Sequence, residues 1–290
     1  MRFGKECYAE INQKLNDKFE QQQVLIAAHR GSWAGNIIQN SVGAYKAALA
    51  MGADMVETDM SMTTDGVIYS FHDRSEPRVF GVAQNIKTMT STQVESYLTK
   101  NSLAEPCSRR VNRLTEVLDA LNHGELINID RSWFWFEPVL RILDQYPNVV
   151  SQAIIKAPLS ARHVLETLNA HPIKYMFMPI CYSLKDIEDA LSYPELNVVG
   201  AELIAFTPQD ELFGEEAVRF CHERSLYTWV NAITLGDVTT KALYGCVDDD
   251  ISILQDPALG WGKLIDMGFD VLQTDWPAIL RDYRRAKLSI

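Results

Sequence analysis

Eight short apolar runs, rich in β-branched residues, recur along the chain of 290 residues and constrain its fold more than any other feature. They are VLIAA at 24, MVETDM at 55, LINID at 126, QAIIK at 152, YMFMPI at 175, VVGAELI at 198, YTWVNA at 227 and VLQTD at 271. Between most of them, apolar residues recur every three or four positions, as on one face of a helix. Alternating strands and helices form parallel sheets, and eight units in about 250 residues favour a closed (β/α)8 TIM barrel over an open doubly wound sheet.

Two segments depart from this repeat. GVIYSFHD, at 66–73, follows the second run after the turn sequence TTDG and predicts a hairpin return. The polar stretch 74–112 predicts an insertion over the barrel mouth, and 235–262 predicts a second excursion before the last strand. We therefore expect a single TIM-barrel domain over 1–290, with 1–23 as an N-terminal helical extension.

The acidic composition argues against some classes of binding partner. The formal net charge is -11 at pH 7, so the general surface should repel nucleic acid and anionic lipid, and a phosphate-bearing ligand would need local positive charge. The five cysteines are scattered and form no Cys-x-x-Cys pair, which argues against a disulfide framework or a zinc knuckle. The N-terminal stretch is polar and no run approaches a membrane span, so we expect a cytoplasmic protein with no stable membrane association.

Three acids stand at the C-terminal ends of predicted strands. Side chains alternate along a strand, so Glu57 and Asp59 in VETDM face the same way, and Asp130 ends the run LINID. Acids that converge on a buried strand end repel each other unless a cation lies between them. Three carboxylates suit a hard divalent cation, Mg²⁺ or Ca²⁺. Solvated strand-end acids, or a helix N-cap in the case of Asp130, would account for the same residues.

Two histidines stand in comparable places. His29 directly follows the run VLIAA, and His72 directly follows VIYSF. Beside a metal, two imidazoles could serve as general base and general acid, because histidine titrates near neutral pH. Each could equally be a hydrogen-bonded structural residue.

The block AHRGSWAGNIIQNSVGAYKAALAMGADMVETDMSMTTDGVIYSFHD, at 28–73, resembles the glycerophosphodiester phosphodiesterase family. It shares with that family, in order, His-Arg-Gly, an asparagine heading the first helix, Glu-x-Asp, Thr-x-Asp-Gly and His-Asp. RLTEVLDAL, LINID, YTWVNAI and GFDVLQTDWPAIL are also similar, so the resemblance covers about residues 24–282. The whole constellation is specific, although each motif alone is weak.

This resemblance implies a (β/α)8 barrel that hydrolyses glycerophosphodiesters to glycerol 3-phosphate and an alcohol, with a small-molecule phosphodiester as substrate. It implies a divalent metal, Mg²⁺ or Ca²⁺, on the three acids Glu57, Asp59 and Asp130. It also makes His29 and His72 the catalytic pair. Arg30 matches the family arginine that faces the phosphate, although an inter-strand salt bridge is an alternative role.

The chain departs from the family pattern at two places. Many members have Pro-Glu-Asn-Thr where this chain has Ile-Gln-Asn-Ser at 38–41, so a charged residue becomes the neutral Gln39. Many also have glutamate at the position of Asp130 and lysine two residues later, where this chain has Ser132. Lys156 is expected to supply the missing positive charge at the phosphate, unless it is a strand-end lysine that extends to solvent.

Other functions remain open at this stage. Trp229 and Trp276 stand near predicted strand ends and are expected to line the substrate pocket, unless they pack in the core. A lipid phosphodiesterase of the same superfamily would need a docking loop, for which the aromatic stretch at 131–138 is the candidate. A non-catalytic barrel that binds a phosphorylated ligand is the more distant alternative.

Overall fold

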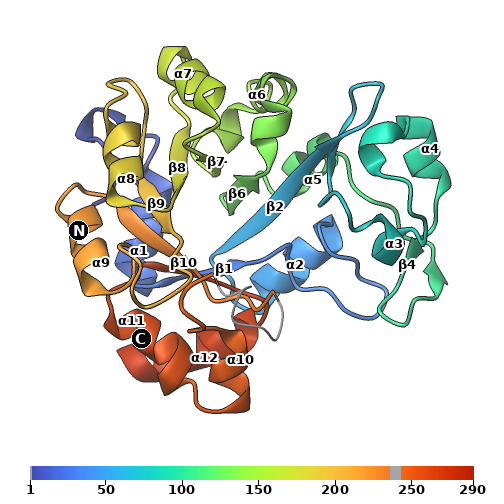
Figure 1. The fold of residues 1–290 in the computed structure, drawn as a ribbon. Coiled ribbons are helices and arrows are strands. Elements are labelled where there is room, and N and C mark those ends of the chain that lie inside the picture. Colours follow the sequence, from blue (N-terminus) through green and yellow to red (C-terminus); the bar gives the residue numbers. More distant parts are fainter. Residues whose placement is uncertain (1, 236–242) are drawn as a thin grey trace.

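The computed structural model describes residues 2–235 and 243–290, and the described residues contain the predicted barrel (Figure 1). Its parallel strands are β1 (Leu25–Ala28), β2 (Met55–Met62), β6 (Leu126–Asp130), β7 (Ala153–Pro158), β8 (Met176–Cys181), β9 (Gly200–Leu203), β10 (Tyr227–Asn231) and β11 (Val271–Thr274). β1 pairs with both β11 and β2, which closes the sheet. The (β/α)8 fold is confirmed, and each apolar run forms one barrel strand.

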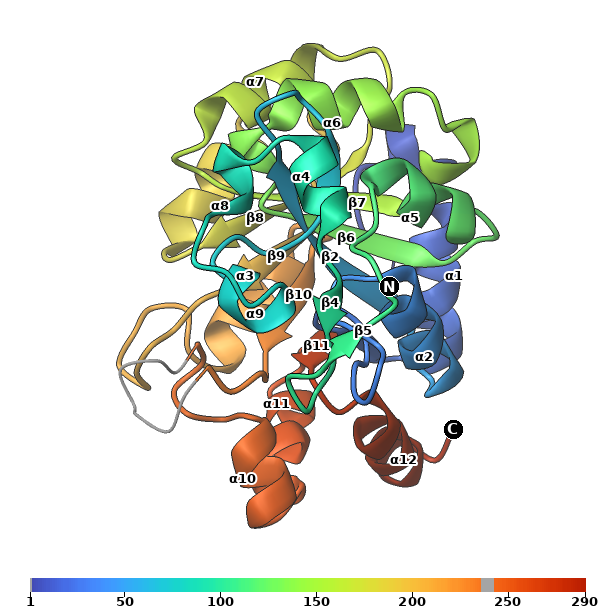
Figure 2. The same ribbon diagram turned by 90° about the vertical axis from the view of Figure 1, so that its right-hand side faces the viewer.

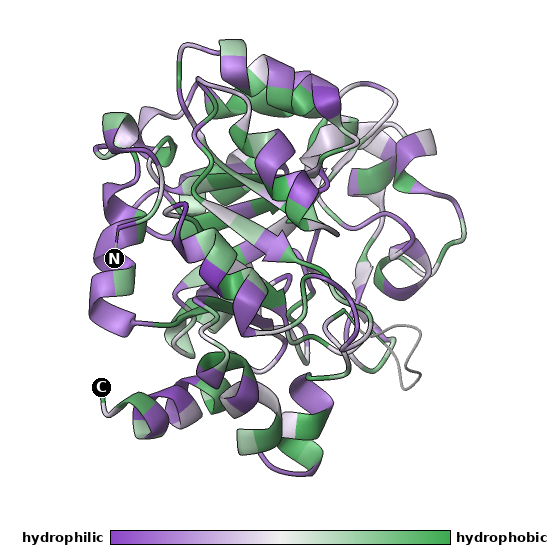
Figure 3. Cartoon of the chain, turned by 60° about the vertical axis from the view of Figure 1, so that its left-hand side comes forward, coloured by the Kyte–Doolittle hydropathy of each residue, from purple (hydrophilic) through white to green (hydrophobic). Residues whose placement is uncertain are grey.

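Helices surround the barrel, as Figure 2 shows. They are α2 (Val42–Ala50), α5 (Leu114–Ala120), α6 (Phe136–Leu143), α7 (Arg162–Ala170), α8 (Leu184–Leu191), α9 (Glu215–His222), α10 (Asp249–Leu254), α11 (Lys263–Asp266) and α12 (Pro277–Leu288). Outward-facing strand residues such as Ile26 and Val56 pack against these helices in one large core. In Figure 3 the central strands are mainly hydrophobic and the outer helices carry both colours, as amphipathic helices should.

The barrel interior changes from apolar to charged along the strands. At its N-terminal end, inward residues such as Met55 and Trp229 form a second core with Leu15 and Phe19 of α1 (Gln13–Gln22). Glu57 lies two residues after Met55 on β2 and therefore also faces the barrel interior. Polar side chains thus occupy the interior toward the C-terminal ends of the strands.

The chain leaves the barrel after β2, as the sequence predicts. β3 (Ile68–Ser70) pairs antiparallel with β2, which confirms the hairpin. The segment that follows holds α3 (Glu76–Val79), α4 (Ser91–Ser96), β4 (Thr99–Lys100) and β5 (Pro106–Cys107). It has a small core of its own, in which the Phe71 and Phe80 rings stack. Part of the second predicted excursion, 236–242, lies outside the described residues.

Membrane-crossing segments can be assessed from helix length and hydropathy. Over 2–235 and 243–290, no helix is both long enough and apolar enough to cross a membrane.

A buried arginine joins the last helix to the first strand. Arg284 of α12 is 2% exposed, and its Nη1 donates to the Val24 carbonyl oxygen at 2.6 Å and to Asp54 Oδ2 at 2.5 Å. Asp54 also accepts the backbone N–H of Ile26 in β1 at 2.9 Å. The ion pair therefore fixes the closure of the barrel where its first and last units meet.

We expect Arg284→Ala to lower the free energy of unfolding by roughly 3 to 5 kcal/mol, because it leaves the Asp54 carboxylate buried without its counter-charge. Urea unfolding followed by circular dichroism measures this loss. Arg285→Ala, at the exposed neighbouring position, is the control and should change stability by less than about 0.5 kcal/mol. Equal effects from both substitutions would contradict a structural role for the buried pair.

Candidate active site

Three carboxylates meet at the C-terminal ends of β2 and β6. Glu57 and Asp59 lie on the inner face of β2, and the strand register places Asp130 beside Asp59. Each of the three offers a carboxylate oxygen, and these oxygens all lie within 4.8 Å of one another. The three acids therefore converge, as the sequence predicts. Glu57 and Asp59 are also buried.

The negative charge of this acidic cluster is only partly balanced. Arg30 Nε lies 3.1 Å from Asp59 Oδ2, and the Arg30 backbone N–H donates to Glu57 Oε2 at 2.9 Å. Burial disfavours the charged form of Asp59, but the Arg30 guanidinium, the two histidines and a hydrogen bond from Asn40 together outweigh it and lower the pKa of that carboxyl. Burial and the neighbouring carboxylates raise the pKa of Glu57 well above its usual value. A further cation would relieve this repulsion.

Asn40 holds the second acid of the cluster in place. Its Nδ2 donates to Asp59 Oδ2 at 2.9 Å, while its Oδ1 accepts the Asp59 backbone N–H at 3.1 Å. Asn40 and Arg30 both have left-handed backbone conformations, with φ of 52° and 54°. This region is sparsely populated by residues other than glycine, and such strain concentrates at functional sites. A Cβ on Gly31 would lie 2.6 Å from the Ala44 backbone, so the turn after His29 requires glycine.

Lys156 lies beneath the acidic cluster, inside the barrel. Its Nζ is 2.6 Å from Asp130 Oδ2 and 3.1 Å from Glu202 Oε2, and its side chain is 3% exposed. Burial alone would lower the pKa of Lys156, but Asp130 and Glu202 raise it above its usual value. Lys156 therefore balances the charge of the third acid from below.

Trp229 lies deeper in the same interior. The ring is fully buried, its Nε1 donates to Asn231 Oδ1 at 2.9 Å, and Lys156 Nζ is 5.6 Å from the ring centroid. Neither Lys156 nor Trp229 is exposed at the barrel mouth, so the geometry gives no support to a direct substrate contact by either, and that role stays a prediction. Trp276, in contrast, is 50% exposed beside the end of β11.

His29 is held by a carboxylate that the sequence analysis did not select. Its Nδ1 donates to Asp275 Oδ1 at 2.9 Å, which leaves Nε2 for a ligand. The backbone N–H of Asp275 donates in turn to Asp249 Oδ2 at 2.9 Å. Burial raises the pKa of Asp249 to about 7, and the Trp261 indole donates to its other oxygen. Asp275 ends the apolar run VLQTD, just as Asp130 ends LINID, so the same sequence pattern indicates both acids.

His72 is held by the backbone that follows it. Its Nδ1 donates to the Asp73 carbonyl oxygen at 2.6 Å, which again leaves Nε2 for a ligand. Burial lowers the pKa of His72, with a partly opposing effect from the Asp59 carboxylate. The Asp73 carboxylate pairs with Arg131 and with Lys87, which fixes the turn after His72.

Comparison with known proteins agrees with this geometry. Residues 29–140 match the model of the glycerophosphoryl diester phosphodiesterase family, and residues 177–284 match that of a domain of unknown function. The glycerophosphodiester phosphodiesterase of Caldanaerobacter subterraneus subsp. tengcongensis is 28% identical over 37% of this chain and 45% of its own length. Lysophospholipase D GDPD1 of Homo sapiens is 31% identical over 41% of this chain and 39% of its own length. The chain thus spans less than half the length of these relatives.

Solved structures share the fold over most of the chain. A glycerophosphoryl diester phosphodiesterase from Parabacteroides distasonis superposes with a TM-score of 0.70 at 19% identity and covers 91% of this chain and 87% of that protein. A phosphodiesterase from Oleispira antarctica, in complex with the product sn-glycerol-3-phosphate, superposes with a TM-score of 0.66 at 14% identity, covering 91% and 98%. The resemblance found in the sequence is confirmed: residues 29–140 are similar to the glycerophosphoryl diester phosphodiesterase family, and curated relatives with related names match part of the chain.

Proposed function

We propose that this chain hydrolyses glycerophosphodiesters to glycerol 3-phosphate and an alcohol. The observation that carries the proposal is the acidic cluster of Glu57, Asp59 and Asp130 at the C-terminal ends of β2 and β6. His29, directly after β1, and His72, after β3, both act electrostatically on Asp59 of this cluster. The match of residues 29–140 to the family model and the product bound in the Oleispira antarctica structure support the same reaction. A phosphodiester carries one negative charge, which the site can receive only where positive charge is concentrated.

The residues of the acidic cluster fit a divalent cation. Three carboxylates within 4.8 Å of one another form the oxygen-rich donor set that Mg²⁺ and Ca²⁺ prefer. Burial first, and then Asp59 and Asp130, raise the pKa of Glu57, and a cation between the acids would offset their repulsion. A cation bound there would withdraw charge from the phosphate oxygens. Arg30 adds a guanidinium on the Asp59 side and would contact the same phosphate.

The two histidines have unequal surroundings, which suggests unequal roles. Asp275 orients the His29 ring and stabilises the positive charge that the ring gains when it takes a proton, as suits a general base acting on water or on the glycerol hydroxyl. His72 has a lowered pKa, so once protonated beside the anionic substrate it gives up its proton readily. It would therefore protonate the departing alcohol.

Divalent ions should be required for activity. We expect EDTA to abolish release of glycerol 3-phosphate from glycerophosphoethanolamine, and Mg²⁺ or Ca²⁺ in excess to restore it. Glu57→Gln, which keeps the size of the side chain, should reduce kcat/KM about 100-fold or more and weaken ion binding in calorimetry. Glu188→Gln, at an exposed position on α8, should change neither. Full activity in EDTA-treated protein that retains no ion would refute the proposed metal requirement.

The roles of the histidines can be separated by the leaving group. His72→Ala should strongly reduce turnover of glycerophosphoethanolamine but spare much of the activity on a p-nitrophenyl phosphodiester, because a phenolate leaves without a proton. His29→Ala should reduce both. The measurement is the ratio of the two rates in each variant, which cancels losses from misfolding or weakened ion binding. The opposite pattern would reverse the two roles, and equal losses would assign protonation of the leaving group to another donor.

A lysophospholipid is the second candidate substrate. An apolar groove of about 420 Å³ lies beside Asp275, and its lining includes Trp33, Met51, Trp276 and Ile279. Trp276 and Ile279 are exposed, and a single acyl chain would cover them. The relative from Homo sapiens is named a lysophospholipase D.

Rates on two matched substrates distinguish the candidates. We expect glycerophosphoethanolamine to be cleaved faster than lysophosphatidylethanolamine, because the surface is acidic and the soluble diester needs no contact with the groove. Trp276→Ala should then leave the soluble reaction within about twofold. Faster cleavage of the lysophospholipid, lost selectively in Trp276→Ala, would establish the second candidate instead.

A further inference from the structure

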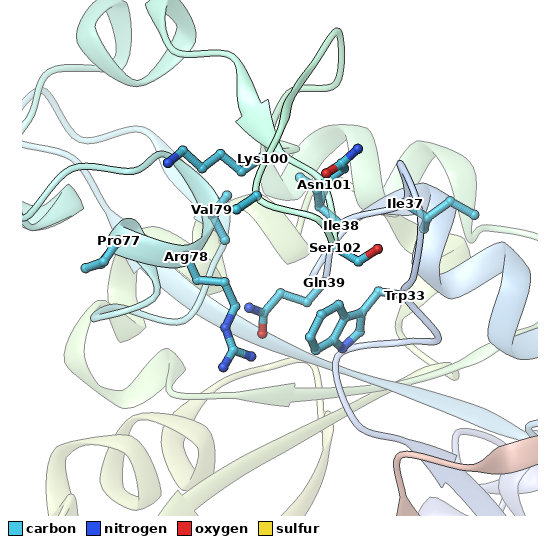
Figure 4. A pocket seen from close by; sticks show the side chains of 11 residues that line it. Trp33, Ile37, Ile38, Gln39, Pro77, Arg78, Val79, Lys100, Asn101 and Ser102 are labelled. Carbon is cyan, nitrogen blue, oxygen red and sulfur yellow. The ribbon is translucent and has the colours of Figure 1, made fainter.

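A second pocket, which shares Trp33 and Ile37 with the apolar groove, opens between the loop after β1 and the insertion. It has a volume of about 400 Å³, and its walls include Trp33 and Gln39 from the loop and Arg78 and Lys100 from the insertion. Figure 4 shows Arg78 and Gln39 directed toward the same space in front of the Trp33 ring. The pocket is thus built from the loop between β1 and α2 and from the insertion after β3.

Gln39 connects this pocket to the acidic cluster. Its Oε1 accepts a hydrogen bond from Arg30 Nη1 at 3.0 Å, and Arg30 in turn pairs with Asp59. The same Gln39 side chain lines the pocket. A group bound in the pocket would therefore lie next to a phosphate held by Arg30. Arg78 belongs to α3, the first helix after His72, so the segment that carries the histidine assigned to the leaving alcohol continues into a wall of the pocket.

The charge of the pocket is positive, in contrast to the chain as a whole. Among the described residues, no carboxylate lies within 4.0 Å of the Arg78 or Lys100 side-chain nitrogens, while the formal net charge of the chain is -11. The acid nearest to Arg78 in sequence on α3, Glu76, is buried and accepts the Ile86 backbone N–H at 2.7 Å. Gln39 is neutral, so it offsets neither Arg30 nor Arg78.

The aromatic wall of the pocket is already engaged by a cation. Arg78 Cζ lies 5.6 Å from the centroid of the Trp33 ring, which is the geometry of a cation–π contact. A quaternary ammonium, which binds aromatic faces in the same way, would have to displace Arg78 and would be repelled by it. An anionic group meets the opposite situation, because the stacked guanidinium keeps free N–H donors for a carboxylate or a phosphate.

We propose that this pocket binds the leaving alcohol and selects head groups that carry an anionic group of their own, such as the carboxylate of a serine head group, over cationic ones such as choline. The proposal rests on the proposed function, since it names the substrate class of the same site. Arg78 is the specificity-determining residue, and it acts by binding the head group without taking part in bond cleavage.

The test compares glycerophosphoserine, glycerophosphoethanolamine and glycerophosphocholine at low ionic strength, where exposed charges are least screened. The serine and ethanolamine head groups differ by one carboxylate. For the unmodified chain we expect kcat/KM to be about tenfold higher for glycerophosphoserine than for glycerophosphoethanolamine, and lowest for glycerophosphocholine. Arg78→Gln should remove the serine preference by raising KM for glycerophosphoserine, and should lower KM for glycerophosphoethanolamine and glycerophosphocholine, whose cationic groups Arg78 repels. Arg78→Glu should reverse the order.

Arg109→Gln is the matched control, because Arg109 is an exposed arginine of the same insertion that does not line the pocket. It should leave the serine-to-ethanolamine ratio unchanged. Equal losses on all three substrates in Arg78→Gln would overturn the proposal, since Arg78 would then bind the phosphate or support the fold. A ratio near one in the unmodified chain would overturn it too. Failure of the unmodified chain to cleave any of the three would instead refute the proposed function.

Discussion

The mutual repulsion of three clustered carboxylates, two of them buried, is the constraint on which the rest of the site depends. Glu57, Asp59 and Asp130 converge because parallel strands end at one edge of the barrel and because inward positions on β2 alternate. Such a group is stable only if cationic groups balance it. Arg30 does so from the mouth and Lys156 from inside the barrel, yet burial and the charges of Asp59 and Asp130 still raise the pKa of Glu57. The remaining negative charge is what makes the site suitable for a divalent ion.

The architecture was predictable because its signals are local. Each barrel strand is a short apolar run, and the two acids of β2 could be assigned to one face from alternation alone. The acids and histidines are recognisable because each lies within, ends or directly follows such a run. The turn at TTDG likewise marked the hairpin, since turn residues between two strand-like runs have few other structures available.

Two features could not be predicted in this way: how deep a side chain lies in the barrel, and which residues far apart in the sequence come into contact. Lys156 and Trp229 follow the right alternation, but the stagger between strands decides how far below the mouth they lie, and one sequence does not determine it. The contact between Asp275 and His29 arises because closure brings β11 beside β1, although 246 residues separate the two. The stacking of Arg78 on Trp33 joins two irregular loops, for which no periodicity exists. The strand ends therefore position the central residues of the site, whereas the tertiary structure positions the residues around them.

Anomalous diffraction tests directly whether the acidic cluster binds a divalent ion. The crystals are those of the active protein grown with Mn²⁺, an ion that accepts the same oxygen ligands as Mg²⁺. A divalent-ion site at the acidic cluster predicts an anomalous peak between the carboxylates of Glu57, Asp59 and Asp130, and its loss in Glu57→Gln crystals. Absence of a peak at these carboxylates, under conditions in which the protein turns over with Mn²⁺, would contradict it.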